Sequence, residues 1–344
     1  MQESLKNALY QPEPAAPRLK GVAIDDLNAL EPDWWDLWRR TPAATPFQSP
    51  AWLIPWRREF APGPLCVGAV FGEGQLVALF PFYAERALSG ARLLPLGVSL
   101  SDYLDILVDP GWPEATAALA AFIADVDWRC CSFEELPPDA CAESLPVPKN
   151  CEDLTGRHSA CPVIALRGGR DLTDCIPARR RRQLRRAWAA AERLGEVRIE
   201  QSEKESERFL ATLFALHEAR WRERNERGVL ADAKVRRFHQ AALPRLAAAD
   251  LARCYTLTIG GQTAAAYYGL SNRGRAYAYL GGFDPAFEEA SPGAILIGHA
   301  IAEAIGEGAG EFHFLRGREA YKYSWGATDR WNQRRLWRRQ AHAR

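Results

Sequence analysis

The sequence predicts an α+β fold made of two similar halves. Residues 253–283 hold three apolar runs separated by Gly-Gly and Asn-Arg-Gly, which is typical of an antiparallel meander with tight turns. A helix and a further strand are expected after the meander, and the same order of elements is expected in the first half. A repeat of this length favours two domains of one fold over a solenoid, with chance similarity of two α+β halves as the alternative.

In the first half, residues 65–83 predict a hairpin that turns at Gly72-Glu73-Gly74. Two extended runs follow between residues 91 and 109. Residues 109–136 predict a helix with Asp109 at its N-cap and then a strand. We expect a link of about residues 137–178, rich in Pro, Gly and charge, to separate this half from the second.

The second half is expected to open with helices at 176–195 and about 203–225, ahead of the meander. Ser291 then suits an N-cap and Pro292 the first helical position. Isoleucines repeat at every fourth residue from Ile297, which predicts one apolar helical face. Glycines after residue 305 end this helix, and a strand is expected at 311–315.

Composition restricts the class of protein. The net charge of +1 gives no global field that would recruit nucleic acid or membrane. No run reaches the roughly 18–20 apolar residues of a membrane span, and the first residues lack the apolar core of a secretory signal. The eight cysteines lack Cys-x-x-Cys spacing, so we expect reduced thiols and no metal site. A soluble, cytoplasmic protein of undetermined oligomeric state is the expectation.

The start of the helix after residue 290 is a candidate phosphate site. A helix N-terminus carries partial positive charge and free N–H groups. Asp109 would oppose a phosphate in the first half, whereas neutral Ser291 and flexible Gly293 would admit one in the second. An ordinary helix start is the alternative. The predicted coenzyme-binding residues are Ser291, Gly293, Ala294 and Ile295.

Several motifs resemble the CelD/BcsL-like acetyltransferases of the GNAT family. They are "YLGGFDPAFEEASPGAILIGHAI" (279–301), "EFHFLRGREAYKYSWGA" (311–327), the basic "RRRRQLRRAWAAAERLG" (179–195) and, upstream, "SDYLDILVDPG" (101–111). The chain is more distantly similar to the Fem aminoacyl-transferases. The resemblance implies tandem GNAT-like (acyl-CoA N-acyltransferase) domains, each a mixed, mostly antiparallel sheet flanked by helices. It implies a degenerate domain at 1–160 and an acetyltransferase domain at 161–344.

Lys322 is the first candidate for a catalytic group, because it follows the strand at 311–315 and a matching lysine acts in the Fem enzymes. It could stabilise an oxyanion or hold a substrate anion. Tyr321 or Tyr323 could protonate the departing thiolate, and His313 could be the general base. The alternatives are a surface lysine between two core tyrosines and a half-buried structural histidine.

Charged and aromatic residues elsewhere could bind the acceptor. Arg316 suits a carboxylate or phosphate, and the arginine-rich helix could bind an anion, coenzyme phosphates or tRNA. The alternative for the arginine-rich helix is an ordinary solvated face. For Asp102 and Tyr103 it is a turn at the end of a strand. The predicted substrate-binding residues are Arg181, Arg185, Arg220, Trp221, Arg316, Asp102 and Tyr103.

The expected function is transfer of an acetyl or other acyl group from acetyl-CoA or another acyl-CoA to an amine or hydroxyl. The acceptor would be a small molecule or a saccharide, with polysaccharide or cell-envelope components among the options. The usual GNAT pyrophosphate loop is reduced here to Gly293, so a Fem-like donor, aminoacyl-tRNA, is one alternative. A non-catalytic GNAT-fold scaffold is the other.

Overall fold

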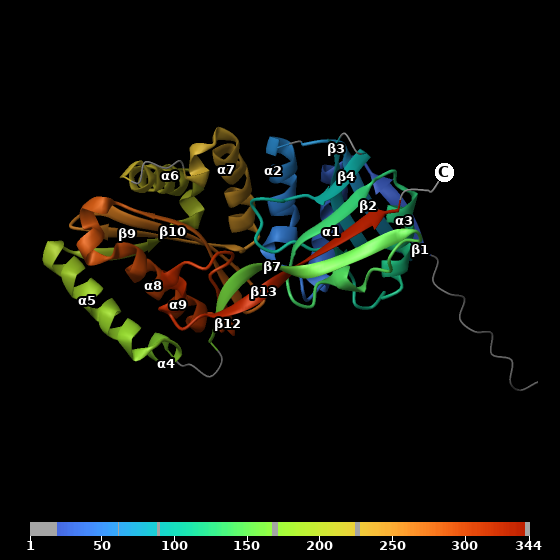
Figure 1. Cartoon of the computed structure of the whole chain (residues 1–344). Coiled ribbons are helices and arrows are strands. Elements are labelled where there is room, and N and C mark those ends of the chain that lie inside the picture. Colours follow the sequence, from blue (N-terminus) through green and yellow to red (C-terminus); the bar gives the residue numbers. More distant parts are fainter. Residues whose placement is uncertain (1–18, 61, 88–89, 167–170, 224–227, 341–344) are drawn as a thin grey trace, which may run out of the picture.

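A computed structural model describes residues 19–60, 62–87, 90–166, 171–223 and 228–340. The first half consists of helices packed against one sheet (Figure 1). Its elements are β1 (Leu19–Ile24), α1 (Leu27–Arg40), η1 (Pro46–Gln48), α2 (Pro50–Phe60), β2 (Leu65–Gly72), β3 (Gln75–Ala87), β4 (Gly90–Pro95), β5 (Leu107–Val108), α3 (Ala115–Asp125), β6 (Cys130–Leu136), η2 (Cys141–Ser144) and β7 (Cys151–Ala165).

The second half repeats this order after two additional helices. Its elements are α4 (Leu172–Cys175), α5 (Ala178–Leu194), β8 (Val197–Gln201), η3 (Glu203–Glu205), α6 (Ser206–Glu223), η4 (Val229–Ala231), α7 (Ala233–Ala248), β9 (Ala252–Ile259), β10 (Gln262–Asn272), β11 (Arg275–Phe283), η5 (Pro285–Ala290), α8 (Pro292–Gly306), β12 (Glu311–His313), α9 (Ala320–Tyr323) and β13 (Thr328–Arg339).

The two halves share a topology. In each, a strand, two helices and an antiparallel meander lead to a strand–helix–strand unit whose strands are parallel. That unit is β4–α3–β6 in the first half and β11–α8–β12 in the second. The predicted meander and repeat are therefore present, and the fold is mixed α/β with a large mixed sheet, as predicted.

The halves exchange their last strands. The sheet order is β1-β2-β3-β4-β6-β13-β7-β12-β11-β10-β9-β8, with β5 paired to β3. β7 follows β6 in the chain but pairs with β12, while β13 follows β12 but pairs with β6. β7 and β13 also pair with each other over nearly their whole length. One continuous sheet thus joins the two halves.

The predicted link at 137–178 was wrong over the length of β7. Residues 152–158 are exposed and mostly charged or polar, because this part of the strand lies in a ribbon with β13. The period-two apolar pattern that indicates a strand is therefore missing. The domain boundary predicted at 160/161 falls inside β7.

Other element boundaries also differ from the predictions. α3 starts at Ala115, so Asp109 does not cap it; the Asp109 carboxylate accepts a hydrogen bond from the Gly111 N–H and pairs with Arg40. The strand expected at 311–315 ends at His313, where the chain turns away.

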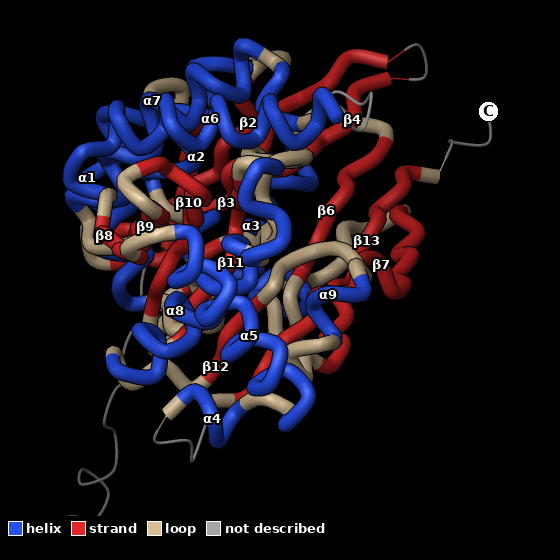
Figure 2. The backbone as a smooth tube through the Cα atoms, turned by 90° about the vertical axis from the view of Figure 1, so that its left-hand side faces the viewer, coloured by secondary structure: helices blue, strands red, loops and turns tan. Residues whose placement is uncertain are grey.

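Helices cover both faces of the sheet in the second half. α6 and α7 lie on one side of β8–β11, and α5 and α8 lie on the other (Figure 2). α2 of the first half packs against α7, where Trp52 and Phe238 meet edge to face with ring centroids 4.9 Å apart. Both halves therefore contribute to one apolar core.

No helix in the described part of the chain is long and apolar enough to cross a membrane. All eight cysteines are free thiols. Among the residues in the described ranges, no group of three or more His, Cys, Asp or Glu side chains is arranged to hold a metal ion.

The strand exchange makes a testable prediction, because Trp337 of β13 is fully buried against Phe133 in the core of the first half. Trp337→Ala should reduce the free energy of unfolding by about 3–5 kcal/mol, the usual cost of truncating a buried aromatic residue. Chemical denaturation measures this change. Trp331→Ala, in the half-buried part of the same strand, is the control and should cost far less. If the two substitutions reduced the free energy of unfolding equally, the exchange of last strands between the halves would be contradicted.

Candidate active site

An opening in the sheet separates β11 from β12. The two strands pair only from Arg275 opposite Glu311 to Tyr277 opposite His313. Beyond this point β11 continues to Phe283, while the chain after β12 turns away and the Phe314 N–H bonds to the Pro162 carbonyl. Within the described residues, no strand pairs with this side of β11 from residue 278 to 283. Its backbone N–H and C=O groups can therefore hydrogen-bond an extended ligand.

The first turn of α8 lies close to the end of β11. Ser291 occupies the N-cap position in a left-handed conformation (φ 48°, ψ 53°), but its side chain accepts no capping hydrogen bond. The Ala294 and Ile295 N–H groups both bond to the Ser291 carbonyl, and the Ile295 side chain is buried. Of the predicted coenzyme residues, Gly293 is therefore the one best placed to offer its N–H to a ligand, aided by the helix dipole.

Two predicted residues lie near Phe283, which the sequence analysis did not single out. A Cβ added to Gly293 would meet only the Phe283 ring, at 3.8 Å, so the surface at this turn is open. The Arg220 guanidinium lies over the same ring, 4.9 Å from its centroid. Arg220 and Gly293 thus lie together at one mouth of the opening. Tyr321 is 47% exposed on α9 and packs edge to face on Phe314, with ring centroids 6.1 Å apart.

The other predicted residues of this half do not gather at the mouth. Trp221 lies beside His217, with ring centroids 5.7 Å apart, and lines a cavity of about 470 Å³ next to α7. Arg181 donates hydrogen bonds to the carbonyls of Thr173 and Ile176. Arg185 is exposed on α5.

A buried hydrogen-bonded chain reaches the fork where β11 and β12 part. The Tyr103 hydroxyl lies 2.9 Å from His313 Nδ1, and His313 Nε2 lies 3.1 Å from Glu311, which also forms two hydrogen bonds with Arg330. Burial lowers the pKa of His313, and hydrogen bonds from His313 and Arg330 lower the pKa of Glu311. Neutral His313 therefore donates from Nε2 to the carboxylate, and Nδ1 accepts from Tyr103.

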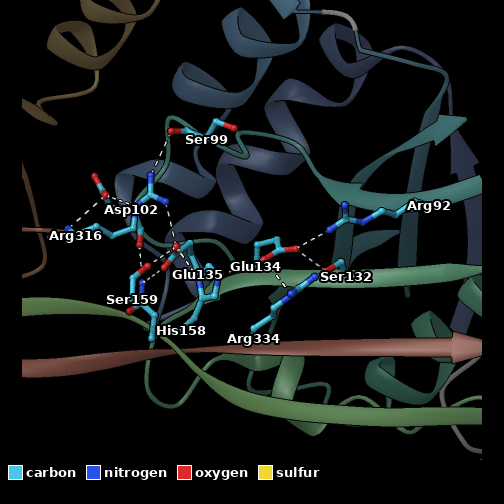
Figure 3. A network of polar contacts seen from close by, with 11 residues as sticks. Arg92, Ser99, Asp102, Ser132, Glu134, Glu135, His158, Ser159, Arg316 and Arg334 are labelled. Atoms are coloured by element: carbon cyan, nitrogen blue, oxygen red, sulfur yellow. Dashed lines mark hydrogen bonds and ion pairs between the residues drawn. The ribbon is translucent and has the colours of Figure 1, made fainter. Parts of the chain in front are cut away.

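Arg316 joins the halves beside this chain (Figure 3). Its guanidinium contacts Asp102 at 2.6 Å, Glu135 at 3.1 Å and the Ser99 carbonyl at 3.2 Å. Burial raises the pKa of Asp102, and the charge of Arg316 opposes the rise. Asn332 also donates to the Glu135 carboxylate and to the Asp102 carbonyl. The predicted Asp102, Tyr103, His313 and Arg316 therefore form one connected cluster.

Three of the nine non-glycine residues with positive φ in the described ranges lie at the same place. Ser99, Glu135 and Leu315 all have φ between 51° and 75°, in the left-handed region that non-glycine residues seldom occupy. Each of them accepts a hydrogen bond from Arg316 or Lys322. Strained residues of this kind persist only where surrounding contacts fix them, and they cluster at functional sites.

Lys322 is buried rather than exposed. Its ammonium donates to the carbonyls of Leu315, Arg316 and Gly317 at 3.4, 2.6 and 3.2 Å and pairs with Glu319 at 2.9 Å. The lysine thus holds the turn that carries the chain away from β12. Tyr323 bonds to Asp329 instead of facing the opening.

The rest of the "YKYSWG" motif fixes the end of this turn. Trp325 is fully buried, and the Arg180 guanidinium stacks 3.9 Å from its ring centroid. Gly326 has φ 88° and packs so closely on Pro177 that a Cβ would lie 3.2 Å from it. The motif therefore docks the segment after β12 against the start of α5.

The described part of the first half differs from the second beside its two parallel strands. α3 packs on β1, β2 and β3, whereas α8 packs on β9, β10 and β11, so α3 lies one strand further from the fork. Beside β4 and β6, Glu134 is bonded to Arg92 and Ser132 and paired with Arg334 (Figure 3). In the first half, an ion pair thus links β4 to β6, and the helix between them lies further from the fork.

Comparisons with known proteins agree with this geometry. Residues 178–323 match the family profile of the acetyltransferase (GNAT) domain. No curated protein matches the chain. The profile covers the half that contains the opening, so this half is similar to a GNAT acetyltransferase domain.

Solved structures resemble nearly the whole chain. The crystal structure of FemX aligns with a TM-score of 0.65 at 11% identity, covering 91% of this chain and 96% of that one. A conserved protein of unknown function from Bacteroides thetaiotaomicron VPI-5482 gives 0.58 at 13% identity, covering 92% and 99%. L-PGS from Bacillus licheniformis gives 0.54 at 14% identity, covering 93% of each chain. At these identities the similarity establishes the fold.

The position of Lys322 makes a prediction about stability. Lys322→Met should reduce the free energy of unfolding by about 2–4 kcal/mol, because the carbonyls of the turn lose a buried charged donor. Denaturant titration measures the change, and exposed Lys234→Met is the control. If Lys322→Met left stability at the control value, the turn-holding role would be wrong.

Proposed function

We propose that the chain is an acyltransferase that moves an acetyl group from acetyl-CoA to an amine or hydroxyl. The observation that carries the proposal is the opening between β11 and β12, which ends near the open first turn of α8. An unpaired strand edge and a helix N-terminus together suit a long ligand that carries amides and a diphosphate. The second half would hold the donor, and the first half would shape the acceptor site.

Each part of the opening matches a part of the donor. The Gly293 N–H and the dipole of α8 attract the diphosphate, with Arg220 adding a positive charge nearby. The free edge of β11, residues 278–283, offers backbone partners to the amides of the pantetheine arm. The thioester would then lie toward the fork, where Tyr277 and His313 face each other.

Tyr321 and the Tyr103–His313–Glu311 chain supply the proton transfers. The acceptor attacks the thioester directly, so the reaction uses no enzyme-bound acyl intermediate. Tyr103 takes the acceptor's proton as it passes its own to His313 Nδ1, and Glu311 stabilises the resulting imidazolium. Tyr321, protonated at neutral pH, returns a proton to the leaving thiolate.

Lys322 and Arg316 act by positioning in this proposal. The ammonium of Lys322 is already bonded to three carbonyls, so it fixes the turn after β12 rather than meeting an oxyanion. Arg316 holds Asp102, and with it the neighbouring Tyr103, against the fork. The acceptor would enter between the halves on the side of Asp102, where a saccharide or another polar small molecule can be bound.

Calorimetry tests the donor. Wild-type protein should bind acetyl-CoA, and Gly293→Asp should weaken binding about 100-fold, because a carboxylate at the helix start repels the diphosphate by about 2–3 kcal/mol. Gly306→Asp, at the other end of α8 where a Cβ meets no atom within 4 Å, is the matched control. An absence of acetyl-CoA binding, or equal binding by both variants, would contradict the proposal.

A further inference from the structure

The outward face of α5 carries arginines that the proposed acyl transfer does not use. Arg180 and Arg181 are engaged, by the Trp325 ring and by the carbonyls of Thr173 and Ile176. Five others on this helix are exposed: Arg179, Arg182, Arg185, Arg186 and Arg193.

These five arginines form one stripe. At 100° per residue they fall within an arc of about 120°, on the side of the helix opposite buried Ala187 and Ala191. From Arg179 to Arg193 the stripe extends about 21 Å along the axis. We call these five residues the arginine stripe.

The arginine stripe is not neutralised by its surroundings. In the described ranges, no ion pair involves any of its members, whereas exposed Arg198, Arg208 and Arg222 each pair with a glutamate. Glu192 is the one acidic residue in α5, against seven arginines. Because the whole chain carries only +1, the remainder of the chain is net negative. The positive charge is therefore local to this helix.

We propose that the arginine stripe docks the protein on an anionic lipid bilayer. A straight row of guanidinium groups on an outer helix presents a flat positive surface, which is complementary to a plane of phosphate headgroups. Leu194, which ends the same helix with 54% of its surface exposed, lies about 60° outside this arc, so the arginines alone make the contact. The apolar face of α5 is packed inside the protein, so the contact is peripheral and electrostatic.

The composition of the stripe favours a bilayer over RNA. Proteins that recognise single-stranded RNA usually stack bases on exposed aromatic side chains. The aromatic residue of α5 is Trp188, which is half-buried and lies outside the arc. The stripe offers charge without a stacking platform.

Docking would also orient the candidate active site. α5 packs against η5 and α8, so the stripe lies on the helix next to the first turn of α8 (Figure 2). If the proposed acyl transfer is correct, the donor site would lie close to the membrane surface, which suits an acceptor that is lipid-linked. This last step rests on the proposed function, whereas the docking surface does not.

Vesicle flotation tests the surface directly. The protein should float with vesicles of phosphatidylglycerol and phosphatidylcholine at low salt, remain unbound with phosphatidylcholine alone, and dissociate as salt rises. The triple variant R179Q/R182Q/R186Q should lower the partition coefficient about 100-fold, since each basic residue contributes appreciably near an anionic surface. The control R198Q/R208Q/R222Q removes the same charge from paired, exposed arginines and should leave binding nearly unchanged.

Two results would overturn the docking surface: equal vesicle binding by the two triple variants, or binding of bulk tRNA that depends on the stripe in the absence of any vesicle binding. If the protein bound vesicles but not acetyl-CoA, the membrane-docking surface would be supported and only the proposed acyl transfer would be contradicted.

Discussion

The pairing of β7 with β13 is the constraint on which the rest of the structure depends. Each strand leaves its own half, and β13 completes the sheet of the other by pairing with β6. Val163 of β7 lies opposite both His313 and Thr328, so β7 holds the end of β12 on one side while β11 departs on the other. The opening exists because the chain after β12 no longer follows β11 but stays beside β7, where the Phe314 N–H bonds to the Pro162 carbonyl. A backbone arrangement, made by segments far apart in the chain, thus creates the site.

Electrostatics then fixes the polar groups at this fork. Arg316 is shared between Asp102 and Glu135, and breaking such a partly buried pair leaves uncompensated carboxylates at a cost of several kcal/mol. The carbonyls that Lys322 binds belong to the same turn as Arg316. Strain at Ser99, Glu135 and Leu315 is therefore held by two cations, buried Lys322 and half-buried Arg316. The first half contributes Asp102, Tyr103 and Glu135 to the site of the second.

Features that depend on neighbouring residues in the chain could be predicted from the sequence. Apolar periodicity and turn residues predicted the meander at 253–283, the helix after Pro292 and the repeated order of elements. The likeness of the "YKYSWG" segment to known transferases drew attention to Lys322. The burial of Lys322 could not be predicted. The carbonyls that bind it point to one place only because the chain turns at Leu315. β7 was missed because exposed charged residues hide a strand that is held by its partner's backbone.

Residues brought together from distant segments were the hardest to predict. Nothing near Glu135 indicates that it meets Arg316, some 180 residues away, or Asn332, because both contacts depend on the strand exchange. Phe283 did carry a signal, as the aromatic residue that ends the meander after two glycines. The contacts of Arg181 could not be predicted for a simpler reason: carbonyls of the segment just before its own helix bind it.

Hydrogen exchange with and without acetyl-CoA tests the central claim, that the opening between β11 and β12 is the single donor site. The account predicts that acetyl-CoA slows amide exchange at residues 278–283 and at the first turn of α8, which includes Gly293. Exchange at the start of α3 should not change, because that helix faces no opening. Slowing at α3, or bound acetyl-CoA with no slowing at 278–283, would contradict the account.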